Sequence, residues 1–295
     1  MPDDALSPES VSPAAQPRLP ALFPEAWACA FGQDDRGLWQ AFAVGDVVQH
    51  LRWLPPGAFL MGSPDDEPER RDNEQQHPVL LTRGLWLADT ACTQALWRAV
   101  LAETPSDFHG PERPVERVSW DDVVERFLPA LNACVPGLDA RLPTEAEWEY
   151  GCRAGTTTPF SFGDRLTTDQ ANYDGNFPYA GGAKGLYRQQ TLEVRALPAN
   201  GWGLYQMHGN VYEWCQDWLG DYPKRLVRDP TGPSAGRERV LRGGRWLGSA
   251  RWCRSAHRIA DVPAYRYWNV GFRLARGPSP QAGGQAGEQG PADWA

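Results

Sequence analysis

Cysteine and histidine are among the residues of this 295-residue chain that could bind a metal ion or attack a substrate, and their spacing limits the chemistry they can do. No two cysteines form a C-x-x-C pair, which argues against a zinc ribbon or a redox dithiol; the six are Cys29, Cys92, Cys134, Cys152, Cys215 and Cys253. The five histidines show neither H-x-x-x-H nor H-E-x-x-H spacing. We therefore expect free buried thiols and no metal hydrolase.

Oxygen ligands are better placed than sulfur or nitrogen ligands. Asn210 and Glu213 lie close together in a turn-rich segment whose backbone carbonyls are also available. A carboxylate beside an amide among carbonyl oxygens is the setting that Ca²⁺ prefers. The segment is therefore a candidate calcium site.

Three helices are predicted around these residues. Leu96, Trp97, Val100 and Leu101 form one apolar stripe in residues 93–101. A second helix begins at Ser119, a good N-cap with Asp122 three residues on, and runs to Leu131. The third begins at Thr144, where Thr-Glu-Ala-Glu forms a capping box and Pro143 discourages helix upstream.

Strands and turns account for most of the remainder. Short apolar runs predict strands at 47–53, 58–61, 78–82 and 85–87, and later at 239–242 and 270–274. Helical periodicity stops after about residue 155, and 30 glycines with 27 prolines imply many turns. We expect an α+β domain at 22–276 with a small antiparallel sheet, a disordered segment at 1–21 and a flexible tail at 277–295.

Composition excludes some partners. The net charge of −8 argues against a nucleic-acid surface, which needs a basic face. No apolar stretch approaches the ~20 residues of a membrane span. The acidic, Pro-rich N-terminus lacks a basic-then-apolar signal pattern, so a cytoplasmic location is expected.

Five segments read together resemble one family. They are PPGAFLMGS (55–63), RLPTEAEWEY (141–150), GLYQMHGNVYEW (203–214), RGG (242–244) and VGFR (270–273). In this order they closely resemble formylglycine-generating enzyme/sulfatase-modifying-factor domains. The resemblance implies a variant C-type lectin fold. It also implies a structural Ca²⁺ ion at Asn210, Val211 and Glu213.

The resemblance implies an oxidase chemistry that this chain does not match. The family binds Cu(I) through two cysteines five residues apart, after a Gly-Gly-Ser element. The matching segment here is GGRWLGSARWC (243–253), in which Cys253 falls on the second cysteine. Gly248 stands at the first cysteine position and Arg245 at the serine position. Because a lone thiolate cannot make a two-sulfur copper site, we expect no formylglycine generation and no catalytic cofactor.

Residues 240–274 also resemble the variable region of diversity-generating-retroelement proteins, whose templates carry Asn triplets in a Gly-Gly-Ser-Trp framework. The framework residues kept here are Gly243, Gly244, Trp246, Arg251, Cys253, Arg254, Ser255, Ala256, Arg258, Pro263, Arg266, Val270, Gly271 and Phe272. Intervening positions, usually Asn in relatives, differ in polarity and size, which is what adenine-directed codon mutagenesis leaves. Trp252 and Trp268 cannot arise from an Asn codon by changes at its adenines alone.

We therefore predict a ligand-binding protein whose surface is formed by Arg245, Leu247, Gly248, Ser249, Trp252, His257, Ile259, Ala260, Asp261, Tyr265, Tyr267 and Trp268. The aromatic residues offer rigid, amphipathic contact area, as in antibody paratopes, and Arg245 and Asp261 add charged anchors. The expected ligand is a protein, with a carbohydrate as the alternative. Two other hypotheses stay open: a drifted non-catalytic relative, and an oxidoreductase with a second ligand set for Cys253.

Overall fold

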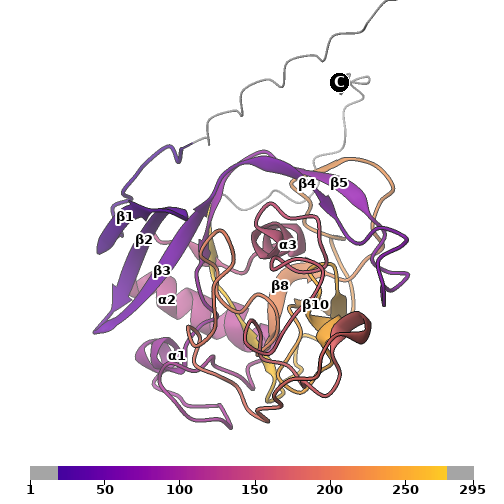
Figure 1. Cartoon of the computed structure of the whole chain (residues 1–295). Coiled ribbons are helices and arrows are strands. Elements are labelled where there is room, and N and C mark those ends of the chain that lie inside the picture. The colour runs from indigo at the N-terminus through magenta and orange to yellow at the C-terminus, as the bar shows by residue number, and fades with distance from the viewer. Residues whose placement is uncertain (1–18, 278–295) are drawn as a thin grey trace, which may run out of the picture.

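The computed structural model describes residues 19–277, and Figure 1 shows their arrangement. The predicted segments 1–21 and 277–295 therefore lie outside the described residues, except at 19–21 and 277. Between these limits the chain has helices and several sheets, so the predicted α+β class is confirmed.

The described residues contain three α-helices, each near a predicted one: α1 (Gln94–Leu101), α2 (Leu128–Cys134) and α3 (Glu145–Arg153). A π-helical segment, η1 (Asp122–Phe127), leads into α2, and the turns η2 (Tyr179–Gly181) and η3 (Ala250–Cys253) are 3₁₀. The capping box is present. The Glu147 amide donates to Thr144 Oγ1 over 3.2 Å, and the Thr144 amide donates to Glu147 Oε2 over 2.8 Å.

Strands form three sheets rather than one. The first is fully antiparallel in the order β1 (Ala30–Asp34), β2 (Gly37–Val44), β3 (Val47–Leu54), β6 (Leu85–Ala88), β13 (Ala275–Arg276) and β7 (Ala140–Arg141). The second has the order β11 (Arg258–Asp261), β10 (Arg239–Arg242), β8 (Tyr212–Trp218) and β12 (Val270–Phe272). The third has the order β4 (Gly57–Met61), β5 (His77–Leu81) and β9 (Val227–Arg228).

Two of these sheets contain a parallel pair, β8 with β12 and β5 with β9. The chain therefore has more sheets than the one small antiparallel sheet that was predicted, and only the first of them is fully antiparallel. The strand β8 was missed by sequence reasoning. Almost every residue of β8 is buried, so the alternation of buried and exposed residues that marks a half-exposed strand is absent.

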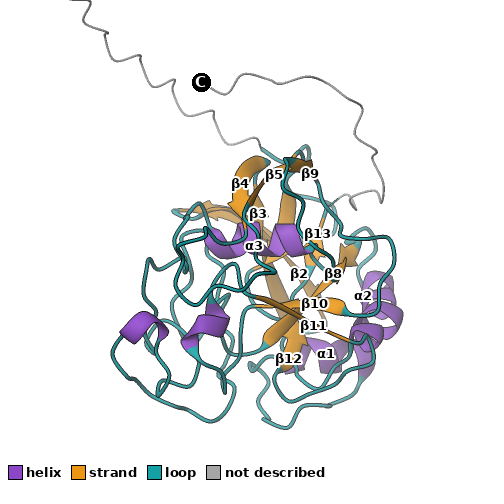
Figure 2. Ribbon diagram, turned by 90° about the vertical axis from the view of Figure 1, so that its right-hand side faces the viewer, coloured by secondary structure: helices purple, strands orange, loops and turns teal. Residues whose placement is uncertain are grey.

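Helices and loops cover opposite sides of the strands. Helices α1 and α2 pack on each other, and α1 packs on β2 and β3. Helix α3 contacts β4, β8 and β10, so it lies between the second and third sheets, at the centre of Figure 1. Figure 2 shows that the side of the molecule away from α1 and α2 is built almost entirely of loops with short helical turns.

Helix α3 carries the centre of a buried ionic network. Arg242 on β10 contacts Glu145 and Glu149 of α3, and all three side chains are at most 5% exposed. Arg258 at the start of β11 binds both oxygens of Glu145, over 2.8 and 2.7 Å. Burial alone would raise the pKa of Glu145, but the adjacent Arg258 and Arg242 guanidinium groups hold it below its usual value.

A second buried cluster ties the same chain segment to the loop before β5. Arg254 donates to Glu74 Oε2 over 2.7 Å and to Glu67 Oε1 over 2.6 Å. Buried charges of this kind persist only when the partners and hydrogen bonds are present together. The two clusters therefore fix the backbone at Arg242, Arg254 and Arg258.

We expect Arg242→Leu to lower the free energy of unfolding by about 3–5 kcal/mol, because the buried carboxylates of Glu145 and Glu149 lose a shared partner. Urea unfolding measures the change. The control is Arg117→Gln, which breaks a half-exposed pair with Asp107 and should leave the midpoint unchanged. Equal midpoints for both variants would show that the network contributes little.

Candidate functional site

The structure brings the C-terminal part of the predicted surface together as a row of aromatic rings. Tyr265 stacks on Tyr267 with ring centroids 5.8 Å apart, and Tyr267 lies 5.2 Å from Trp268. Tyr267 and Trp268 are 42% and 40% exposed, which is high for such large rings. Trp268 in turn lies 6.4 Å from Trp246, a buried framework residue. We call these four residues the aromatic row.

Most of the other predicted residues retain some exposure next to this row. Leu247 and Ser249 lie in the loop after β10, Trp252 lies on η3, and Ile259, Ala260 and Asp261 lie on the edge strand β11. Arg245 is partly exposed, and its Cζ lies 5.2 Å from the centroid of the Trp252 ring. The predicted positions therefore lie on three local elements: the loop after β10, the turn η3 and the strand β11, which pairs with β10.

Two predicted residues do not contribute side chains to the surface. His257 is 1% exposed: its Nε2 lies 3.3 Å from the Tyr212 hydroxyl and its Nδ1 lies 3.6 Å from Glu74 Oε1. Burial lowers the pKa of His257 to about 4, against the neighbouring Glu74. Gly248 is also buried, and a Cβ there would lie 2.6 Å from Trp252 Cε3. Both assignments to the surface were wrong.

Sequence reasoning missed a neighbouring loop that extends the surface. Phe177 and Leu186 are each 60% exposed. The loop holding them is tied to the predicted segment, since the Asp174 amide donates to the Gly248 carbonyl over 2.9 Å. Tyr187 stacks on Trp246 at 6.3 Å. The only sequence signal was a few apolar residues in a Gly-rich stretch, which does not reveal which surface they join.

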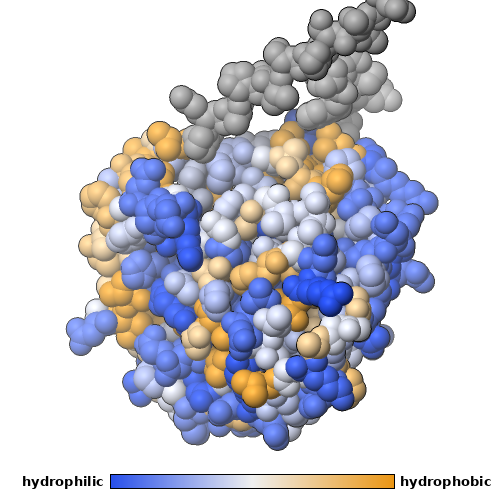
Figure 3. All heavy atoms as spheres, in the orientation of Figure 1, coloured by the Kyte–Doolittle hydropathy of each residue, from blue (hydrophilic) through white to orange (hydrophobic). Residues whose placement is uncertain are grey.

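Polar and apolar residues are mixed on the face of the molecule that Figure 3 shows. In Figure 3 the apolar residues on the visible face gather in separate groups, at the upper and left edges and in the lower centre, with strongly polar residues between them. No group there forms the uninterrupted apolar face typical of permanent interfaces. Interfaces that form and dissociate have this mixed character.

The predicted calcium site does not fit the geometry. Both carboxylate oxygens of Glu213 accept from Arg273, over 2.6 and 2.8 Å, and Oε2 also accepts from Trp148 Nε1 over 2.7 Å. A carboxylate already neutralised by a guanidinium is a poor ligand for a dication. Asn210 Oδ1 accepts from the Leu192 amide and from Asn172 Nδ2.

One oxygen near Asn210 remains without a partner among the described residues, the buried Asn172 Oδ1. A single neutral amide oxygen does not replace the six to eight or so oxygen ligands of Ca²⁺. Within residues 19–277 there is also no group of three or more His, Cys, Asp or Glu side chains that could hold a metal ion.

Cys253, at the position of the second family cysteine, is fully buried. Burial raises the pKa of its thiol to about 12, against a hydrogen bond from the Arg245 amide. Cys152 on α3 and His208 lie beside it: the His208 Nδ1 is 2.7 Å from the Cys253 carbonyl, and Cys152 Sγ is 3.8 Å from His208 Nε2. Burial lowers the pKa of His208 to about 4 and raises that of Cys152 to about 12. Protonated thiols at neutral pH are weak metal ligands.

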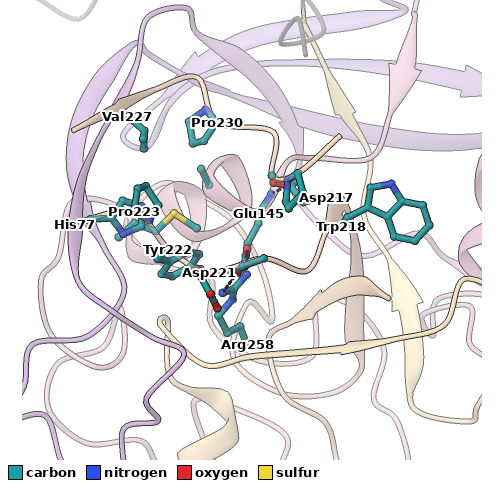
Figure 4. A pocket seen from close by; sticks show the side chains of 15 residues that line it. His77, Glu145, Asp217, Trp218, Asp221, Tyr222, Pro223, Val227, Pro230 and Arg258 are labelled. Atoms are coloured by element: carbon teal, nitrogen blue, oxygen red, sulfur yellow. Dashed lines mark hydrogen bonds and ion pairs between the residues drawn. The ribbon is translucent and has the colours of Figure 1, made fainter. Parts of the chain in front are cut away.

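A partly open cavity of about 70 Å³ lies at the N-terminal end of α3, apart from the predicted surface. Figure 4 shows Glu145, Tyr222 and Arg258 pointing toward one another at its wall, with Asp217 beside them. Its volume suits only about two water molecules, since each occupies ~30 Å³ in the liquid. The cavity therefore belongs to the buried ionic network and is too small for a ligand site.

A buried acid supports the loop beneath the aromatic row. Glu116 is fully buried; its Oε1 accepts from the Phe108 amide over 2.9 Å, and its Oε2 has no hydrogen-bond partner among the described residues. Phe108 packs edge-on against Trp246 at 5.4 Å. Burial raises the pKa of Glu116 to about 7, although the Phe108 and Asp107 amides oppose the shift.

The chain is similar to the proteins of one known family. Residues 41–278 match the model of the Sulfatase-modifying factor enzyme 1-like domain. The formylglycine-generating enzyme of Bos taurus is 35% identical over 198 residues, 64% of this chain and 50% of the relative. The chain thus spans about half the length of the curated relatives it matches.

Solved structures add a second kind of relative. Treponema denticola variable protein 1 superposes with a TM-score of 0.70 at 29% identity, over 81% of this chain and 99% of that protein. PvdO from Pseudomonas aeruginosa gives a TM-score of 0.66 at 27% identity, over 80% of this chain and 97% of that protein. Within residues 19–277, no helix is both long enough and apolar enough to cross a bilayer.

We expect Glu116→Gln to gain stability relative to the wild type as pH rises from 5 to 8, by about 1–2 kcal/mol. The pKa of Glu116 is raised from 4.5 to about 7 in the fold, so its contribution is fully present below the lower value and is lost as pH rises through the higher one. Glutamine stays neutral throughout.

Urea unfolding at several pH values measures this difference. Glu125→Gln, at an exposed site on η1, is the matched control and should follow the wild type. If Glu116→Gln also follows the wild type at every pH, the carboxyl of Glu116 does not titrate in this range.

Proposed function

The chain belongs to the Sulfatase-modifying factor enzyme 1-like family, and we propose that this member uses the C-type lectin-like fold of the family to bind a ligand without catalysis. The ligand-binding surface is formed by the exposed residues between Arg245 and Trp268, together with Phe177, Leu186 and Tyr187. We further propose that it is the variable protein of a diversity-generating retroelement.

The observation that carries this proposal is that two sets of residues in the segment 240–274 differ in burial. The framework residues are buried apart from Arg251, Pro263 and Arg266. The residues standing where relatives usually have Asn retain exposure apart from Gly248 and His257. Substitutions at exposed positions change stability little, whereas buried positions tolerate few changes. A surface built in this way can accept new side chains while its backbone stays fixed.

The likeness to Treponema denticola variable protein 1 over nearly its whole length supports the same proposal. The chemistry of the site supports it too, since Gly248 replaces one copper cysteine and burial keeps the Cys253 thiol protonated. A protein is the ligand that suits a surface with rigid aromatic rings and an adjacent arginine. The net charge of −8 disfavours nucleic acid.

Sequencing of the gene locus tests the diversification. We expect a near-copy of codons 240–274, differing at adenines, beside a reverse-transcriptase gene. Independent isolates should differ at positions that retain exposure, such as the partly exposed Leu247 and Ile259 and the exposed Tyr267, and should keep the buried Arg254 and Arg258. Codons 141–153 serve as the internal control, and their product should be constant. A locus without the near-copy, or one with changes spread evenly over both stretches, contradicts the proposal.

The second candidate function is a formylglycine-generating oxidoreductase, favoured by the relatives at 35% identity and by the position of Cys152 and His208 beside Cys253. A Cu(I) titration separates the two. We expect no stoichiometric binding by the wild type and no difference between the wild type and Cys253→Ser, because Gly248 leaves Cys253 without the second thiolate of the two-sulfur copper site. Tight binding that Cys253→Ser abolishes would favour the oxidoreductase.

A further inference from the structure

Two guanidinium groups flank one indole ring at the edge of the ligand-binding surface. The Cζ atoms of Arg245 and Arg251 lie 5.2 and 5.7 Å from the centroid of the Trp252 ring. Arg245 also lies 5.6 Å from the ring of Tyr212, so its guanidinium is held between two aromatic faces. Cation–π contacts of this kind orient an arginine without neutralising its charge.

Neither of these arginines has an ion pair with any described residue, unlike the other arginines of the segment. Each of the others binds a carboxylate; they are Arg242, Arg254, Arg258, Arg266 and Arg273. The exposed Arg71 adds a third positive charge that acts on Tyr212 and His257. Three arginines that form no ion pair within residues 19–277 thus act on this part of a chain whose net charge is −8.

Buried hydrogen-bond donors at the same place also lack acceptors. Arg245 Nε, Trp246 Nε1 and Trp252 Nε1 are buried, and none has a partner among the described residues. Trp246 is only 7% exposed as a residue, so ordinary surface hydration does not reach most of it. A buried donor without an acceptor is costly, and the described residues supply no acceptor to these three groups.

We infer that Arg245 and Arg251 bind the carboxylate of an acidic side chain of a protein partner, beside Trp252. A guanidinium matches a carboxylate geometrically through two parallel hydrogen bonds, and the charge of the anion relieves the repulsion among the arginines. This inference rests on the proposed function and adds the chemistry of its ligand.

A short acidic peptide segment suits the site better than an extended polyanion. The aromatic row and the exposed Phe177 and Leu186 lie on the same surface, and they can cover apolar side chains next to the acidic one. A sulfated polysaccharide has no such side chains. The overall negative charge would also repel a long polyanion beyond the few cations of this site.

The test is selection of random peptides displayed on phage against the purified full chain and against the double variant Arg245→Gln/Arg251→Gln. We expect peptides selected by the wild type to be enriched in Asp or Glu beside apolar residues, and to bind the double variant at least about tenfold more weakly. Their affinity for the wild type should fall as salt rises. Arg83→Gln, which removes an exposed charge elsewhere, should bind as the wild type does.

Further outcomes separate this inference from the proposed function. Peptides that lose binding to Trp268→Ala but not to the double variant would overturn the acidic-residue inference and leave the ligand-binding function standing. A wild type that selects no peptide would contradict both for a protein ligand. Binding of heparin in preference to the peptides would overturn the peptide assignment. Thermal unfolding of each variant shows that it is folded before binding is measured.

Discussion

The sharing of Glu145 between Arg242 and Arg258 is the interaction on which the rest of the structure depends. Glu145 opens α3, Arg242 ends β10 and Arg258 begins β11, so one carboxylate joins a helix to two adjacent strands. Removing three charged groups from water is costly, and only a geometry that satisfies all of them at once compensates. The two ends of the segment between Arg242 and Arg258 are therefore held in fixed positions against α3.

That constraint explains why the exposed side chains of the segment can differ so much in type. Arg254 adds a second tie to Glu67 and Glu74, and three rings of the aromatic row, Tyr265, Tyr267 and Trp268, lie further on, before β12. None of these ties involves an exposed position such as Leu247 or Tyr267. Because the backbone is fixed by buried groups, a change at the surface alters what can bind without altering the fold. In antibodies, too, the variable binding loops are held by a rigid scaffold, which there is a sandwich of strands.

Structure that depends on residues close together in the sequence could be predicted, whereas contacts between residues distant in the sequence could not. The capping box at Thr144 depends on residues three apart, and the helix begins there as predicted. Glu213 was a poor candidate ligand because Arg273, sixty residues later, occupies its carboxylate. His257 resembled a surface residue only because nothing in the sequence placed it against Glu74 and Tyr212. The family resemblance supplied the fold correctly, but it did not indicate which side chains of this chain pair with one another.

Trp252 lies between the position of the first family cysteine, residue 248, and the two arginines of the proposed binding surface. A side chain at Gly248 would begin 2.6 Å from the Trp252 ring, which is closer than two carbon atoms can approach. A cysteine at residue 248, the first copper position, therefore requires the indole to move. The indole holds Arg245 and Arg251 in place through its two flanking contacts, so its displacement would disperse those charges. In this chain the two-cysteine site and the present arginine arrangement thus compete for the same space. Glycine at residue 248 leaves the space that the Trp252 indole occupies.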